Sequence, residues 1–147
     1  MIFMMGEFAA EFPADRWYAK NHMWALKAGE HTRFGLSAYA VRLLQDVYFL
    51  DWEVEPGAEL SLKQEIGQIE SSKAESALYS PTAGKLVEIN AALLRDPSAI
   101  NVDKYGAGWM FSLACDAQHL LSPEAYLDHL ESVWEVAQRT IKGQMNE

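Results

Sequence analysis

The sequence predicts a mainly β domain with helices, an α+β chain whose short strands form a compact barrel or sandwich. Three observations support this fold class. Short apolar runs recur between regular turn signals, several of them alternate apolar and polar residues, and a stripe of apolar residues at helical spacing follows near the end of the chain. With 147 residues, half of them hydrophobic, the chain suits one domain with a substantial core.

The chain opens with an extension, residues 1–17, that we expect to pack against the domain or to fray. Its first five residues are apolar, but they have no basic flank and meet Glu7 too soon for a secretory signal or a membrane span. A hairpin is expected next. Residues 24–27 and 32–36 alternate on either side of Ala28-Gly29-Glu30, where glycine supplies the positive φ of such turns.

A short helix should follow Ser37, whose hydroxyl can accept hydrogen bonds from the first-turn amides, with Val41 and Leu44 as its buried stripe. The next strand is expected over residues 47–54 and ends at Glu55-Pro56-Gly57. Its apolar face should be Tyr48, Leu50, Trp52 and Val54, with Asp51 and Glu53 turned outward. Further strands are predicted at 64–70, 77–79, 86–89 and 109–114, the last with Trp109, Phe111 and Leu113 inward.

The last element predicted is a helix over residues 122–143, packed on the main domain of residues 18–115. Ser122-Pro123-Glu124 is a strong helix start, and Gly143 is expected to end the helix. Packing on the domain is favoured over binding a partner. The stripe consists of Tyr126, Leu130, Val133, Trp134, Ala137 and Ile141.

The residue with the most functional content is Lys73, which lies at a polar hairpin tip between two strand-like runs. Glu70 precedes it and Glu75 follows it. An exposed lysine between acids is most often solvated surface. A lysine held out on a hairpin is also the shape of a modification site, because a modifying enzyme can approach the backbone on both sides.

Six sequence blocks in order decide between these interpretations. From residue 18 to 114 the chain resembles the H proteins of the glycine cleavage system and their lipoyl-carrier relatives. The family pattern has His-Glu-Trp, Gly-Ile-Thr, Leu-Gly-Asp-x-Val-Phe, Glu-Ser-Val-Lys-Ala, Pro-x-Ser-Gly-x-Val-x-Glu-x-Asn and Tyr-Gly-x-Gly-Trp. The matching segments are His22-Met23-Trp24, Gly35-Leu36-Ser37, residues 44–49, Glu70-Ser71-Ser72-Lys73-Ala74, residues 81–90 and residues 105–109.

The resemblance implies a barrel-sandwich hybrid fold with lipoic acid in amide linkage to Lys73, on the tip of a β-hairpin. It also places Glu70 and Gly57 at positions tied to recognition by the lipoate ligase or lipoyltransferase. Acylation would remove the lysine charge and add a long arm ending in a dithiolane, a redox pair that holds a transferred group on sulfur. The chain is then a carrier without a catalytic centre of its own, reoxidised by dihydrolipoamide dehydrogenase.

Two departures from the family pattern affect the cargo. Where the family has acids that face the folded-back arm, this chain has Met23 and Ala77. A cationic aminomethyl group would lose its carboxylate partners there. Our first hypothesis is therefore a lipoate-binding carrier for sulfur oxidation with a heterodisulfide-reductase-like complex. The alternatives are a glycine cleavage H protein, which works with glycine decarboxylase and aminomethyltransferase, and a binding module without lipoic acid.

Composition limits the partners. A net charge of −9 and a pI near 4.9 argue against nucleic acid and anionic membrane surfaces, so we expect protein partners with basic faces. The single cysteine, Cys115, cannot form an internal disulfide and is expected to be a small buried residue, which suggests a cytoplasmic monomer. No hydrolase elbow, phosphate loop or His-Glu-x-x-His motif is present. The histidines lack metal-ligand spacing, and His22 is expected to be structural; the four are His22, His31, His119 and His129.

Overall fold

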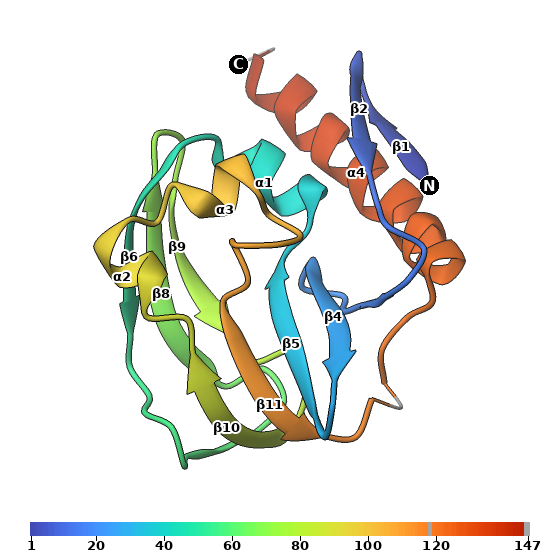
Figure 1. Ribbon diagram of the computed structural model, residues 1–147. Coiled ribbons are helices and arrows are strands. Elements are labelled where there is room, and N and C mark those ends of the chain that lie inside the picture. Colours follow the sequence, from blue (N-terminus) through green and yellow to red (C-terminus); the bar gives the residue numbers. More distant parts are fainter. Residues whose placement is uncertain (118, 146–147) are drawn as a thin grey trace.

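The fold is a barrel-like pair of β-sheets with a long helix and a small hairpin on one side (Figure 1). The computed structural model describes residues 1–117 and 119–145, with side chains described up to Ala137 in the last helix. Across these residues the strands form a six-stranded sheet, a three-stranded sheet and a two-stranded sheet. The orders are β3-β4-β5-β11-β10-β7, β6-β8-β9 and β1-β2.

The strands pair antiparallel, and most pairs join strands that are consecutive in the sequence. The strands are β1 Ile2–Met5, β2 Phe8–Glu11, β3 Trp17–Tyr18, β4 Met23–Ala28, β5 His31–Leu36, β6 Val47–Trp52, β7 Glu59–Leu60, β8 Glu65–Ser71, β9 Glu75–Tyr79, β10 Gly84–Ile89 and β11 Phe111–Cys115. The helices are α1 Ala38–Leu44, α2 Ala92–Arg95, α3 Ala99–Val102 and α4 Pro123–Met145. The predicted mainly β fold with a C-terminal helix is therefore confirmed.

The main core lies between the six-stranded and three-stranded sheets. Phe34, Phe111 and Leu113 of the larger sheet are fully buried, and they meet Ile66 and Ile69 of the smaller one. The hairpin predicted around Gly29 is present as β4 and β5, and Gly29 has a φ of +67°. Gly35 is required by packing, because a Cβ there would lie 2.7 Å from the Trp24 ring.

The alternation predicted for residues 47–54 is wrong at Tyr48. Val47 and Leu50 are buried, whereas Tyr48 is 62% exposed. The pairing of β6 with β8 shifts register between Val47 and Phe49, and this bulge turns both aromatic side chains outward. Trp109, just before β11, is partly buried and packs against the second core as predicted, while its ring also lies under the Arg33 guanidinium at 4.3 Å.

The predicted cap of α1 differs in its chemistry. Ser37 is the N-cap residue, but its hydroxyl makes no cap bond and lies 3.0 Å from the Tyr126 hydroxyl. The amide of Ala38 is instead satisfied by the Tyr105 hydroxyl at 2.9 Å.

At the start of α4 the predicted cap is present, because Ala125 N donates to Ser122 Oγ at 3.1 Å. Helix α4 continues through Gly143 to Met145, so the predicted end at Gly143 is wrong.

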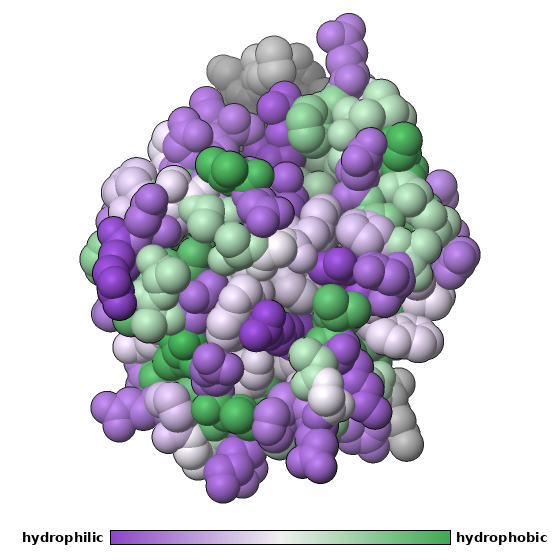
Figure 2. All heavy atoms as spheres, in the orientation of Figure 1, coloured by the Kyte–Doolittle hydropathy of each residue, from purple (hydrophilic) through white to green (hydrophobic). Residues whose placement is uncertain are grey.

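A second core joins the N-terminal segment to α4. Strands β1 and β2 pair as a hairpin, and Phe12 packs edge-on against Tyr126 of the helix. Tyr126 and Leu130 are fully buried, so the predicted stripe packs inward, while the side chain of Ile141 lies outside the described residues. Apolar atoms also gather on the outside of this hairpin, where Ile2 and Met4 are about half exposed (Figure 2).

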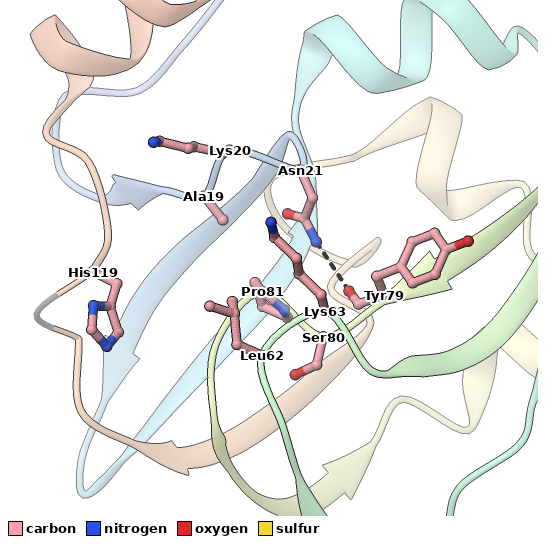
Figure 3. A pocket seen from close by; sticks show the side chains of 9 residues that line it. All are labelled: Ala19, Lys20, Asn21, Leu62, Lys63, Tyr79, Ser80, Pro81 and His119. Carbon is pink, nitrogen blue, oxygen red and sulfur yellow. Dashed lines mark hydrogen bonds between the residues drawn. The ribbon is translucent and has the colours of Figure 1, made fainter.

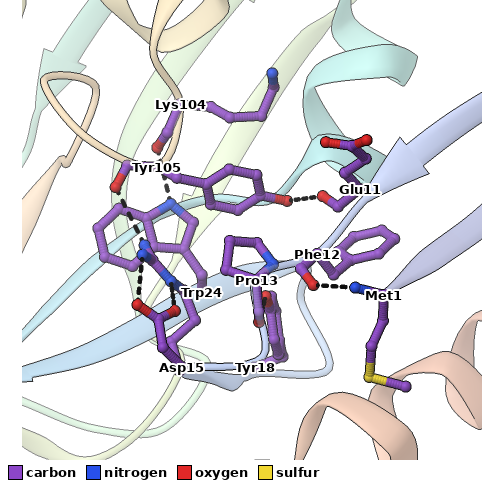
Figure 4. A network of polar contacts seen from close by, with 10 residues as sticks. Met1, Glu11, Phe12, Pro13, Asp15, Tyr18, Trp24, Lys104 and Tyr105 are labelled. Atoms are coloured by element: carbon purple, nitrogen blue, oxygen red, sulfur yellow. Dashed lines mark hydrogen bonds and ion pairs between the residues drawn. The ribbon is translucent and has the colours of Figure 1, made fainter.

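A polar network ties this N-terminal segment to the 103–109 loop (Figure 4). Arg16 is paired with Asp15 at 2.9 Å and donates to Tyr105 O at 3.1 Å, while its guanidinium lies 4.9 Å from the centre of the Trp24 ring. Trp24 Nε1 donates to Lys104 O at 2.9 Å, and the Tyr105 hydroxyl donates to Glu11 O at 2.6 Å. Residues 1–17 are thus an ordered part of the domain.

Candidate functional site

Lys73 lies on the tight tip that connects β8 to β9, and its side chain is exposed. The tip is organised by the buried hydroxyl of Ser71. Ser71 Oγ donates to Ala74 O at 3.2 Å and accepts from Lys73 N and Ala74 N at 3.3 and 3.1 Å. Ser71 N also donates to Ala74 O at 2.9 Å. One serine therefore fixes the backbone on both sides of the lysine.

A second serine fastens the tip to the rest of the domain. Ser72 N donates to Asp46 O at 2.9 Å, and Asp46 N donates to Ser72 Oγ at 3.2 Å. Position 72 is a valine in the family pattern, so of these two bonds only the one from Asp46 N to Ser72 Oγ requires the serine here. Neither Ser71 nor Ser72 was assigned a role from the sequence, although a serine at a turn is a known local signal for such bonds.

The charges around the lysine are acidic. Glu70 and Glu75 pair across the two strands directly below the tip, and Glu70 also pairs with Phe49 of β6. Across the described part of the chain, no hydrogen bond or ion pair involves the Lys73 ammonium. Strands β6, β8 and β9 contain no lysine or arginine. Lys73 is thus the cation of an otherwise acidic sheet.

Met23 and Ala77 lie in the walls of one recess, and its use as the arm pocket stays a prediction. Both line a recess of about 200 Å³ between β4, α1 and β9, with Leu36, Leu43 and Ile69 among its other walls. Met23 is 1% exposed. The residues lining the recess include no aspartate or glutamate. The recess beside the lysine hairpin is therefore apolar and free of carboxylates.

His22 forms one wall of this recess in a strained backbone conformation, with a φ of 72°. Its Nδ1 lies 2.9 Å from the Tyr126 hydroxyl, and its ring centre lies 4.5 Å from that of Tyr39. Burial, helped by the nearby His129, lowers the pKa of His22 to about 4. The imidazole is therefore neutral at physiological pH and adds no charge to the recess.

Gly57 is not brought near the lysine. Strand β6 begins beside the tip, where Val47 pairs with Ser71, and runs away from it to Trp52. Gly57 lies beyond that far end, with a φ of +99° and its amide bonded to Leu86 O at 2.7 Å. A strand of this length spans about 17 Å, so any recognition of Gly57 would need an enzyme that contacts both ends of the sheet.

Comparison with known proteins gives one consistent result. The family model described as glycine cleavage H-protein matches residues 16–135. The chain belongs to the glycine cleavage H-protein family. It is similar to glycine cleavage system H proteins of Thermus thermophilus, 38% identical over 83% of this chain and 98% of that protein, and of Stenotrophomonas maltophilia, 40% identical over 84% and 97%. None of these descriptions refers to sulfur oxidation.

A solved structure of this H-protein family supports the same assignment. The crystal structure of a glycine cleavage system H protein from Mycobacterium marinum matches with a TM-score of 0.69 at 31% sequence identity, over 82% of this chain and 98% of that one. The barrel-sandwich fold expected from the resemblance is therefore confirmed. The sequence blocks alone did not show where the recess without carboxylates lies, or that Ser72 forms hydrogen bonds with Asp46.

Lipoic acid is the cofactor of this H-protein family, attached covalently to a lysine, and the residues present fit it. Lys73 is exposed, has no competing partner among the described residues and lies on a fixed tip. The apolar recess next to it suits the hydrocarbon part of an arm. Within the described residues no helix has the length and apolar content needed to cross a membrane.

Proposed function

We propose that Lys73 is the lysine to which lipoic acid is attached, and that the chain works as a swinging-arm carrier. The observation that carries this proposal is the unpaired, exposed lysine on a tip held by Ser71. When bound, lipoic acid supplies a dithiolane that holds a transferred group on sulfur and cycles between two redox states. The chain's own residues position the attachment point, offer a neutral recess and present a docking face.

We propose further that the carrier serves glycine cleavage. In this role it takes the aminomethyl group from glycine decarboxylase to aminomethyltransferase, and dihydrolipoamide dehydrogenase restores the disulfide. A lipoate ligase or lipoyltransferase attaches the arm, and the chain acts in the cytoplasm as a monomer. The family membership and the descriptions of its relatives support this assignment over a sulfur pathway.

A second candidate function rests on the recess. A cationic aminomethyl group enclosed without a carboxylate partner is costly, and Met23 and Ala77 provide none. An uncharged sulfur cargo would fit beside the polarisable Met23 thioether. The second candidate is therefore a carrier in sulfur oxidation that works with a heterodisulfide-reductase-like complex.

The sheet of β6, β8 and β9, which carries Lys73 at its tip and is called the lysine sheet below, is otherwise acidic. This charge supports docking to basic partner proteins in either pathway. Acylation of Lys73 would leave this sheet with carboxylates and no cation; they are Asp51, Glu65, Glu70 and Glu75. The crowding is already visible at Glu53, whose pKa is raised by desolvation and by the neighbouring Glu65 carboxyl. Basic partner surfaces would relieve this like-charge repulsion and steer association.

The first experiment is intact mass spectrometry of protein made in its native host. A lipoyl increment that is lost in Lys73→Arg, and kept in Lys85→Arg, would support the attachment site, because arginine keeps the charge but cannot form the amide. An increment that persists in Lys73→Arg would refute it. Protein without any increment would favour the binding-module alternative.

The second experiment separates the two pathways. Lipoylated parent and Ala77→Asp are loaded from glycine by glycine decarboxylase, and the rate at which the aminomethyl group is lost from the arm is followed by mass. Ala77 is the better site for an added acid, since Met23 is buried and a glutamate there would be desolvated. Slow loss from the parent favours glycine cleavage. Poor loading, improved about tenfold by the added carboxylate, favours the sulfur candidate.

A further inference from the structure

A second hollow, next to the recess of Met23 and Ala77, is lined by basic and polar residues together with Ala19, Leu62 and Pro81. It encloses about 370 Å³. Three segments far apart in the sequence form it: the turn before β4, the turn between β7 and β8, and the residues that follow β9, with His119 on the opposite side (Figure 3). Asn21 and Tyr79 line both hollows, so the two lie next to each other.

The charge of this hollow is opposite to that of the chain. The protein has a net charge of −9, yet the lining residues include two lysines, one histidine and no carboxylate. Among the described residues, neither Lys20 nor Lys63 has an ion-pair partner. An acidic chain that gathers unpaired cations around a concave surface creates a local positive potential there.

The position of Lys63 is fixed by its backbone. Lys63 has a φ of 67°, a left-handed conformation that is unfavourable for a residue with a Cβ. Two hydrogen bonds hold this turn to the end of β9: Lys63 N donates to Ser80 O at 3.0 Å, and Ser80 N donates to Gln64 O at 2.8 Å. Figure 3 shows the Lys63 side chain running from this turn toward Asn21, whereas Lys20 extends away along the rim.

The Asn21 amide lies beside the Lys63 ammonium (Figure 3). Asn21 Nδ2 donates one hydrogen to Tyr79 O at 3.0 Å, and Asn21 Oδ1 accepts from Met23 N at 3.3 Å, which fixes the amide orientation. The second Nδ2 hydrogen is left for a ligand. The Ser80 hydroxyl is already used, since it donates to Thr82 O at 2.7 Å. The His119 imidazole lies across the hollow, apart from the Lys63 ammonium and the Asn21 amide.

We propose that this hollow binds a small oxyanion, with Lys63 and the Asn21 amide as its ligands and Lys20 as a long-range attraction on the rim. The volume lies at the lower end of the range for ligand pockets, about 300–1,000 Å³, which suits a small ion better than a cofactor. Inorganic sulfate, inorganic phosphate and a carboxylate share the required chemistry. The site needs neither lipoic acid nor Lys73, so it goes beyond the proposed carrier function.

The test is a titration of the unlipoylated full-length chain, followed by the backbone amide signals in NMR. Sodium sulfate, sodium phosphate and sodium acetate are added in separate arms, with sodium chloride adjusted to hold the ionic strength constant. We expect saturable shifts at residues 19–21, 62–64 and 79–81 with a dissociation constant of about 1–10 mM. Tighter binding of sulfate or phosphate than of acetate would assign a tetrahedral dianion, and the reverse order would assign a carboxylate.

Three variants make the result decisive. Lys63→Gln should weaken binding at least about tenfold, which is the scale for losing one charged hydrogen bond. Lys63→Arg should retain most of it, because the charge stays in place. Lys27→Gln makes the same change of charge at an exposed residue on β4 outside the hollow and should leave the constant within about twofold.

The proposal is overturned by any of three outcomes. The first is the absence of saturable shifts in all three arms. The second is an equal weakening in Lys63→Gln and Lys27→Gln, which would indicate a general charge effect. The third is a set of shifts centred away from residues 19–21, 62–64 and 79–81. Because unlipoylated protein is used, failure here leaves the attachment of lipoic acid to Lys73 untouched.

Discussion

His22 should make the stability of this protein depend on pH, and the replacement His22→Asn should remove that dependence. Asparagine is the right substitution because it tolerates the left-handed φ of 72° and its amide can replace Nδ1 opposite the Tyr126 hydroxyl. In the unfolded chain the histidine titrates near 6.5, whereas in the fold its pKa is about 4. The unfolded state therefore binds the proton more readily.

The sign and the window follow from linkage. Above pH 6.5 the imidazole is neutral in both states, so its full contribution to stability is present. As the pH falls from 6.5 to 4, protonation of the unfolded state lowers the free energy of unfolding, by up to about 3 kcal/mol. The groups that face the ring are His129 and Tyr126 from α4 and Tyr39 from α1.

The assay is urea unfolding of parent and His22→Asn at pH 7.5, 6.5, 5.5 and 4.5. Carboxylates change the stability of both proteins, so the difference between them isolates His22. That difference should shift in favour of the variant by about 2–3 kcal/mol between pH 7.5 and 4.5. His119→Asn, at an exposed histidine, should stay parallel to the parent. Parallel curves for parent and His22→Asn would show that the ring is not held neutral by burial.

Three further predictions concern the tip and the core. Ser71→Ala should lower the free energy of unfolding by about 1–2 kcal/mol and slow lipoylation, since one hydroxyl makes the three bonds that fix the tip. Glu70→Ala should slow lipoylation, measured as the rate of mass increase with a lipoate ligase, and change stability by less than about 0.5 kcal/mol. Gly35→Ala should cost about 1–3 kcal/mol in urea unfolding, because its Cβ would press on the Trp24 ring.

Each of these predictions has a control or a contradicting outcome. Ser76→Ala removes an exposed hydroxyl whose one hydrogen bond among the described residues is to Ala77 O, and it should leave both readouts unchanged. Glu59→Ala removes an acid from β7, outside the lysine hairpin, and should be lipoylated at the parent rate. For Gly35→Ala, a loss below about 0.5 kcal/mol would mean that Trp24 moves aside without strain.

The sequence was sufficient where local signals and packing agree. The hairpin at Gly29 and the capped start of α4 at Ser122 were predictable, because the turn residue and the cap residue act over three or four positions. The exposed face of β6 was not predictable. A bulge shifts the pairing by one residue, and nothing in the alternation of residues 47–54 encodes the partner strand that causes it.

The residues of the candidate site were also predictable only in part. Lys73 and its flanking acids could be recognised from sequence blocks, and so could Met23 and Ala77 as departures. That these two line one recess depends on β4 and β9 meeting beside α1, which is a property of the fold. The left-handed backbones of His22 and Lys63 were not predictable, since neither is glycine or asparagine; tertiary hydrogen bonds to Tyr126 and Ser80 accompany them.

The distribution of charge separates two tasks of a carrier. Acidic residues cover the outer face of the lysine sheet, whereas the arm recess beside it contains a neutral His22 and no carboxylate. Salt screens exposed charges over about 8 Å at physiological ionic strength but hardly affects the burial of apolar groups. Association with a basic partner should therefore weaken as salt is added, while seating of an uncharged arm in the recess should not. Electrostatic attraction then controls docking, and apolar burial controls retention of the cargo. Docking can therefore be reversed without release of the cargo.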